Sequence, residues 1–387
     1  MTEPAAAMPS GPVIVHVFGR TDVGRTREHN EDAFVVADLT QNIASLQNEV
    51  RTHTVGERGS LFMVADGMGG AAAGELASQM ATEVVLSELT KKWRGADSRD
   101  PDAFAAALRA AGEAANAHIN EYAAKHPENR GMGSTATIAG LLGDTLYLAQ
   151  VGDSRGYLVR DGVARQITRD QSLVQRLVDA GEITAEEAEM SDRRNIILQA
   201  LGPEPNVKIE LTHQRVKRGD VLILCSDGLS GQVRVDEIGQ VVSEEKELVD
   251  VCRRLIDLAN EAGGPDNITV VAVRFDGEGL EVASGGDDDV GHHLFQSPAE
   301  RRATLEVEAV SDDDVRQLQM APTIEVTPLD PSTIPPTPPD GMAPVMAAPA
   351  DIALPSPRGP SLATLRVMFI VLGIVVASVF AAIWLRK

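Results

Sequence analysis

The chain has 387 residues, 43% of them hydrophobic, which is enough for one large domain or two domains of ordinary size. It carries 57 acidic residues against 35 basic ones, a formal net charge of −22. Proteins that bind nucleic acid normally present a basic patch, so we expect no nucleic-acid partner. With two cysteines, Cys225 and Cys252, the chain has no disulfide framework, which suits a reducing compartment.

The first part of the chain predicts strands. Residues 1–12 are expected to be flexible, and they lack the basic and apolar regions of a secretory signal. Short apolar runs bounded by polar turns predict strands at 13–18, 30–36 and 61–66. The residues between the second and third strands, 41–59, are expected to form a loop.

The middle of the chain predicts helices and then more strands. Apolar residues recur at helical spacing in 76–89 and 104–122, which predicts two amphipathic helices. Asp161-Gly162 is a strong hairpin turn between two short strands. The strands expected in this region are 134–142, 145–151, 156–160 and 163–167.

The remainder of the domain follows the same scheme. A charged, helix-prone insert occupies 169–201, and the elements expected after it are a strand at 221–225, helices at 235–242 and 245–262, and a strand at 268–275. Strands joined by hairpins favour antiparallel sheets over a parallel, doubly wound sheet. The fold class is therefore α+β, with antiparallel sheets covered by helices.

The composition changes after Gly277. Residues 278–362 are acidic and then rich in proline, with 12 of the chain's 21 prolines between Pro322 and Pro360, and such a segment predicts a disordered linker. Val367 to Leu385 contains no charged residue and is long enough to cross a bilayer. We therefore expect residues 363–387 to form a C-terminal transmembrane anchor, with the rest of the chain in the cytoplasm at the inner membrane.

Five aspartates stand in turns at or beside strand ends: Asp32, Asp66, Asp153, Asp227 and Asp266. Each motif alone also fits an ordinary turn. Antiparallel sheets can bring several strand ends to one edge, and carboxylates gathered there without histidine or cysteine are suited to Mg²⁺ or Mn²⁺. Arg27, just before Glu31 and Asp32, is placed to hold a phosphate bidentately beside such ions.

These residues resemble an ordered family signature. The segments that carry it are 21–32, 66–70, 133–136, 151–155, 226–229 and 264–269. Together they are similar to the metal-dependent protein phosphatases of the 2C type, and most similar to the bacterial branch that opposes Hanks-type serine/threonine kinases. The resemblance covers about residues 13–277, the expected catalytic domain, and implies a central β-sandwich of two antiparallel sheets flanked by helix pairs.

The resemblance also implies a catalytic role for Arg27, Asp66 and Asp227, with Arg27 binding phosphate. It implies two to three Mn²⁺ or Mg²⁺ ions, held by Asp66, the Gly67 carbonyl, Asp227, Asp266, Asp153, Asp32 and Glu31, with Asn267 supporting them through water. A metal-activated water would then hydrolyse phosphoserine or phosphothreonine. The implied partners are phosphorylated proteins, including a kinase and its substrates, acted on by a monomeric catalytic domain.

Three positions depart from the family pattern. Met68 stands where animal relatives carry a histidine proposed as a general acid, and Gln171 and the pair Ser191–Asp192 replace histidine-containing motifs in the insert that matches the family's flap. A cysteine-based phosphatase is excluded, because the residues six positions after the cysteines are Gly231 and Leu258 rather than arginine. Two alternatives stay open: a dedicated regulatory phosphatase of one signalling protein, and a catalytically silent, membrane-displayed binding module.

Overall fold

The computed structural model describes residues 11–45, 50–283 and 289–297. Their strands form two antiparallel sheets. The first sheet runs in the order β10 (Val163–Gln166), β9 (Arg155–Arg160), β12 (Val221–Cys225), β13 (Ile268–Asp276), β1 (Ile14–Asp22) and β4 (Arg51–Thr54). The second runs β11 (Glu210–Arg215), β8 (Thr145–Val151), β7 (Ala136–Leu142), β5 (Ser60–Met68), β2 (Asp32–Asp38) and β3 (Ile43–Ser45), and β6 (Gly133–Ser134) also pairs with β5.

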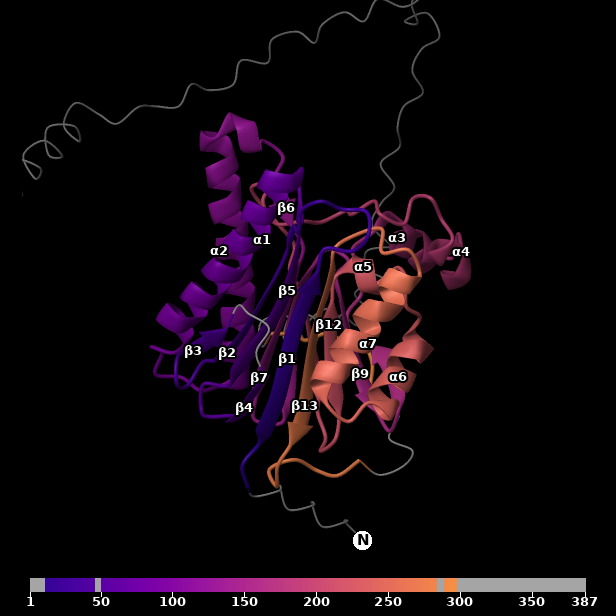
Figure 1. Cartoon of the computed structure of the whole chain (residues 1–387). Helices are drawn as coiled ribbons and strands as arrows, with labels where there is room; N and C mark the ends of the chain where they lie inside the picture. Colours follow the sequence, from indigo (N-terminus) through magenta and orange to yellow (C-terminus); the bar gives the residue numbers. More distant parts are fainter. Residues whose placement is uncertain (1–10, 46–49, 284–288, 298–387) are drawn as a thin grey trace, which may run out of the picture. The chain divides into compact units, whose positions relative to one another are not determined.

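The helices cover the outer faces of the two sheets, as Figure 1 shows. The second sheet is covered by α1 (Ala71–Glu88), the π-helical turn η1 (Leu89–Trp93) and α2 (Pro101–Lys125), which is followed by the short η2 (Pro127–Asn129). The first sheet is covered by α6 (Val235–Glu244) and α7 (Leu248–Glu261). The remaining helices are short: α3 (Leu173–Asp179), α4 (Ala185–Glu189) and α5 (Asp227–Ser230).

Three apolar layers hold this arrangement together. Alternate residues of each strand point to opposite faces, so both sheets contribute one face to a central layer that includes Phe62, Leu148 and Phe275. The other faces pack against helices, with Phe104 of α2 on one side and Leu255 of α7 on the other. The predicted α+β fold, a central β-sandwich flanked by helix pairs, is confirmed.

One prediction about strands was wrong, and one strand was missed. The expected loop at 41–59 contains the short strands β3 and β4, each at the edge of a sheet. The edge strand β11 was missed because its buried side chains include Thr212 and Gln214, and polar residues at buried positions hide the alternation that marks a strand.

The packed part of the chain continues past Gly277. Leu280 and Val290 join the central layer, and the ring of Phe295 lies edge-on to Tyr147 with centroids 5.5 Å apart. Residues 289–297, which we call the strap, extend the second sheet: the His213 amide donates to the His293 carbonyl at 2.9 Å and the Phe295 amide to the Leu211 carbonyl at 2.8 Å. A disordered linker beginning at residue 278 is therefore contradicted for residues 278–283 and for the strap.

A buried ion pair fixes the start of the strap. The Arg160 guanidinium donates to both carboxylate oxygens of Asp220, at 3.0 and 2.8 Å, and the two side chains are only 4% and 1% exposed. Arg160 also forms an ion pair with Asp289 of the strap. One buried arginine thus joins β9, the turn before β12 and the strap.

The predicted transmembrane anchor at 363–387, the flexible N-terminus up to residue 10 and the linker from 298 to 362 lie outside the described residues. Among the helices that are described, none combines the length and the apolar character needed to cross a bilayer.

Candidate metal centre

The pairing of β2 with β5 brings the first two aspartates of the centre together. Asp32 and Asp66 are direct partners in this antiparallel register, so both carboxylates stand at the same end of the second sheet. The Gly67 amide donates to the Glu31 carbonyl at 3.1 Å. Residues separated along the chain are thereby brought to one edge, as the sequence predicts.

The turn after Asp66 requires glycine. A Cβ atom at Gly67 would lie 2.0 Å from the Gly74 carbonyl oxygen and 2.7 Å from that of Glu31, distances that no side chain tolerates. The Asp66 amide donates to the Thr135 hydroxyl at 3.0 Å, and the Thr135 amide donates back to the Asp66 carbonyl at 2.8 Å. The backbone of Asp66 is therefore fixed from both sides.

The first sheet supplies Asp227 and Asp266. Asp227 is the first residue of α5, directly after β12, and Asp266 precedes β13. The Ser226 hydroxyl donates to Asp32 at 2.7 Å, which ties the end of the first sheet to the end of the second. Asp32, Asp66, Asp227 and Asp266 therefore belong to one site.

Asn267 supports this site through direct hydrogen bonds. Its side-chain oxygen Oδ1 accepts from the Glu31 amide at 2.8 Å, while its side-chain nitrogen Nδ2 donates to the carbonyls of Val23 and His29 at 3.0 and 2.9 Å. The side chain thus fixes the segment that carries Arg27 and Glu31. The sequence predicted support through water, but not these contacts.

The carboxylates strongly perturb one another. Burial raises the pKa of Asp66 well above its ordinary value, and the charges of Asp32, Asp227 and Asp153 raise it further. Burial likewise raises the pKa of Asp32 to about 7 and that of Asp153 to about 8, in both cases with help from Asp227. The pKa of Asp227 is raised mainly by burial, although a hydrogen bond with Asp66 lowers it. Like charges this close favour a bound cation.

Glu31 and Arg27 border the same cluster. The pKa of Glu31 is raised by burial, and the charge of Arg27 opposes this rise. The Arg27 guanidinium donates to Asp266 at 2.8 Å, with the arginine side chain 47% exposed. Arg27 therefore lies at the open side of the carboxylate cluster, as expected for a group that meets an anionic ligand.

The donor set fits divalent cations. Three buried oxygens, Oδ1 of Asp32, of Asp153 and of Asp227, have no hydrogen-bond partner in the described part of the chain. An unpaired buried carboxylate oxygen is costly, and a hard cation is the ligand that would satisfy it. Within the described ranges, no group of three or more His, Cys, Asp or Glu side chains has the geometry to hold a metal ion. Protein donors already bind Asp266 and Asp32.

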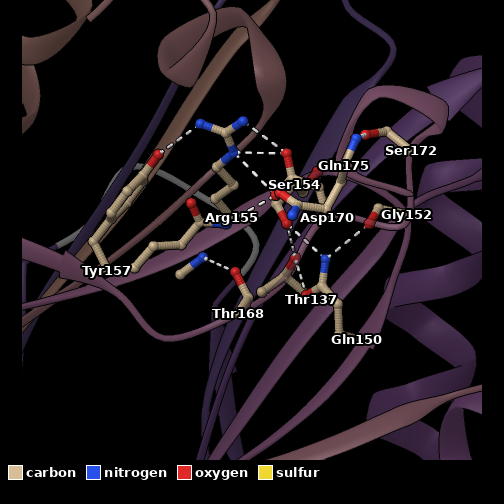
Figure 2. A network of polar contacts seen from close by, with 12 residues as sticks. Thr137, Gln150, Gly152, Ser154, Arg155, Tyr157, Thr168, Asp170, Ser172 and Gln175 are labelled. Carbon is tan, nitrogen blue, oxygen red and sulfur yellow. Dashed lines mark hydrogen bonds and ion pairs between the residues drawn. The ribbon is translucent and has the colours of Figure 1, made fainter. Parts of the chain in front are cut away.

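The two neighbours of Asp153 in the chain, Gly152 and Ser154, are held by hydrogen bonds from Gln150, as Figure 2 shows. The side-chain nitrogen Nε2 of Gln150 donates to the carbonyls of Gly152 at 3.2 Å and Ser154 at 2.7 Å, and the Thr137 hydroxyl donates to Oε1 of Gln150 at 2.9 Å. Beside it, Arg155 binds Asp170 in a bidentate ion pair and donates to the Tyr157 hydroxyl at 3.2 Å. Sequence reasoning missed these supports, although Arg155 follows Asp153 by only two residues.

The departures in the insert have structural roles. Gln171 accepts from the Gly152 amide at 3.0 Å and donates to the Gln150 carbonyl at 3.2 Å, so it fastens the base of the insert to the Asp153 turn. Ser191 accepts from the Arg193 amide at 3.2 Å, and Asp192 is exposed. Met68, at the end of β5, is 37% exposed.

Both cysteines are buried, and burial raises the pKa of Cys225 and of Cys252 to about 12. Neither thiol forms a thiolate near neutral pH, so neither acts as a nucleophile. This agrees with the exclusion of cysteine chemistry made from the sequence.

A family model described as protein phosphatase 2C matches residues 44–269. The chain belongs to this family. The serine/threonine protein phosphatase PstP of Mycobacterium tuberculosis is 39% identical over 285 residues, covering 72% of this chain and 49% of PstP, so the chain spans about half of that relative. The serine/threonine phosphatase stp of Listeria monocytogenes is 36% identical over 263 residues, 68% of this chain and 96% of stp.

One similar solved structure contains manganese. The catalytic domain of PstP in complex with 2 manganese ions is 37% identical, with a TM-score of 0.55, and the match covers 68% of this chain and 99% of that domain. The family assignment therefore rests on sequence and fold together, as the six ordered motifs predicted.

Proposed function

We propose that this member of the protein phosphatase 2C family hydrolyses phosphoserine and phosphothreonine in proteins, with Mn²⁺ or Mg²⁺ as cofactor. The observation that carries the proposal is the cluster of Asp32, Asp66, Asp153 and Asp227, whose pKa values burial and mutual repulsion raise together. The relatives named as serine/threonine phosphatases, one of them solved with manganese, support it.

Each residue of the cluster has a proposed task. Asp66, Asp227, Asp266 and the Gly67 carbonyl would hold cations at the junction of the sheets, Asp153 with Asp227 a further one, and Glu31 and Asp32 would act on the second cation. Bound cations would acidify a water and offset charge on the phosphoryl oxygens. Arg27 would bind two phosphoryl oxygens through its guanidinium, and Asn267 would keep the Arg27–Glu31 segment in place.

Metal removal tests the proposal. A phosphothreonine peptide should be hydrolysed in the presence of Mn²⁺ and left intact after EDTA treatment, and added Mn²⁺ should restore the rate, because the carboxylate cluster alone offers no nucleophile. Release of phosphate is the measurement. Hydrolysis that persists in EDTA would exclude the metal-dependent reaction.

Arg27→Ala provides a second arm of this experiment. Because Arg27 is half-exposed at the border of the cluster, its loss should raise KM about tenfold or more while Mn²⁺ still binds, as expected for loss of one charge-assisted hydrogen-bond pair. Arg253→Ala, an exposed arginine of α7, serves as the control. An unchanged KM for the Arg27 variant would remove it from the phosphate site.

We propose in addition that residues 363–387 anchor the protein in the cytoplasmic membrane, with the catalytic domain in the cytoplasm and phosphorylated proteins, among them a serine/threonine kinase and its substrates, as partners. The uncharged run from Val367 to Leu385 supports the anchor. Reporter fusions at the two ends of the chain test it, and a periplasmic signal from the N-terminal fusion would reverse this orientation.

Of the alternatives, a dedicated regulatory phosphatase uses the same site and differs only in its substrate range. A catalytically silent binding module would be expected to lack part of the carboxylate set. Asp66, Asp227 and Asp266 are all present at the junction of the two sheets, which favours an active phosphatase.

A further inference from the structure

A groove of about 790 Å³ leads away from the metal centre. Its lining includes Arg27, Asp153, Asp227 and Asp266 of the metal centre, and Val290 and Gly291 of the strap. Its walls are the insert, the strands β9 and β10, and the segment from Asp227 to Val235. In Figure 1, α3, α4 and α5 lie near one another at one end of the domain. The groove is large enough to hold several residues of an extended peptide.

The charges along these walls differ from those of the whole chain. Beyond the metal centre, the guanidinium of Arg155 is neutralised by Asp170, with which it makes a bidentate ion pair. The remaining charged lining residues are Arg165, Arg194, Arg234 and Glu189. Arg194 and Arg234 against Glu189 give this stretch of the lining a net positive charge in a chain whose net charge is −22.

Two of these arginines are available to a ligand. Arg194 is exposed and donates to the backbone carbonyl of Glu189 at 3.4 Å, which leaves its charge uncompensated at that contact. Arg234 is 73% exposed, and its nearest ion-pair partner, Asp236, is 74% exposed at 3.4 Å. A pair so open to water is weak and can be exchanged for a ligand carboxylate at little cost. Two further acids lie near Arg234: the Glu237 carboxylate accepts from its backbone amide at 2.9 Å, and Glu186 of α4 has its pKa lowered mainly by its own backbone hydrogen bond.

Apolar side chains line the same groove between the charged ones. Val174, Ala188 and Val233 are buried and border it. A peptide bound here would therefore meet apolar contacts along the walls and guanidinium groups at the exposed positions.

We propose that this groove binds the polypeptide next to the phosphorylated residue, and that Arg194 and Arg234 select substrates with acidic residues in that flanking segment. This inference rests on the proposed phosphatase function. Its physical basis is that an acidic flank is repelled by the overall charge of the chain but attracted locally by the groove. The approach to the site is thus selective for acidic segments that reach these two arginines.

The test compares two phosphothreonine peptides of equal length whose flanking residues are glutamate in one and glutamine in the other. The full-length protein with Mn²⁺ should show a higher kcat/KM for the acidic peptide, and added salt should reduce the difference. Arg194→Gln and Arg234→Gln should each lower the acidic-to-neutral ratio about two- to fivefold, the range of one exposed ion pair. Both kcat/KM values of a ratio are measured on the same variant. A partial loss of folded protein therefore lowers both values equally and leaves the ratio unchanged.

Arg253→Gln, which changes an exposed arginine on α7, should leave the ratio unchanged. Equal kcat/KM for the two peptides in the unsubstituted protein, or a ratio that both groove variants leave unaltered, would overturn the inference while hydrolysis itself still upheld the phosphatase. If neither phosphopeptide is hydrolysed, the proposed function fails. Fluorescence anisotropy with the unphosphorylated peptides then tests the selectivity of the groove separately. A groove that selects acidic segments binds the glutamate peptide more tightly than the glutamine peptide.

Discussion

Asp66→Asn should lower kcat/KM for phosphopeptide hydrolysis by about 10³-fold or more, because metal-ion catalysis contributes several kcal/mol of transition-state stabilisation and each 1.4 kcal/mol is tenfold. Asp66 is the central carboxylate of the site: it pairs with Asp32 in the register of β2 and β5, and the charges of Asp32, Asp227 and Asp153 all raise its pKa. Asparagine keeps the shape and removes the charge. The rise in melting temperature caused by Mn²⁺ should shrink in parallel.

Asp97→Asn is the matched control, because it makes the same chemical change at an exposed position between η1 and α2. It should leave both the rate and the Mn²⁺-dependent melting shift as in the unsubstituted protein. Near-normal hydrolysis by Asp66→Asn would contradict the assigned role of Asp66.

Asp66→Asn should also raise the stability of the protein once EDTA has removed its cations. In the folded state the pKa values are about 7 for Asp32 and about 8 for Asp153, whereas the unfolded chain releases these protons near pH 4. The folded state thus binds more protons across this window, and the free energy of unfolding falls as pH rises through it. In EDTA at pH 8, Asp66→Asn should therefore melt higher than the unsubstituted protein, and Mn²⁺ should reverse this order. An identical melting temperature for the two proteins in EDTA would speak against repulsion in the cluster.

Arg160→Met should lower the free energy of unfolding by about 3–5 kcal/mol, the usual cost of leaving one partner of a buried ion pair uncompensated. Asp220 would lose both guanidinium contacts while only 1% exposed, and the strap would lose its bond from Arg160 to Asp289. Urea denaturation of the full chain measures the change.

Arg215→Met tests whether exposure sets this cost. Arg215 also binds an aspartate, Asp144, at 2.7 Å, but the side chains are 50% and 28% exposed, so its loss should cost less than about 1 kcal/mol. The double variant Arg160→Met/Asp220→Leu should recover much of the stability, because no unpaired buried charge is left. Equal costs for the two arginines would show that burial is not the deciding factor.

The sequence predicted most of the fold and the main set of site residues. Apolar alternation and helical spacing located the strands and helices, because a strand buries every second residue and a helix buries one stripe. The aspartates that gather at the junction of the two sheets could be picked out because each follows or precedes a strand within a short motif, and six such motifs in order are specific to one family. These signals are local, so they can be read along the chain.

Only the tertiary structure decided what depends on register and on long-range pairing. The opposition of Asp32 to Asp66, the bond from Ser226 to Asp32 and the fastening of the Asp153 turn by Gln171 join residues whose proximity is set by the order of strands in two sheets. The strap was hidden for the same reason. Its few apolar residues become a packed segment only beside β11 and Arg160, and no local pattern encodes partners so distant in the sequence.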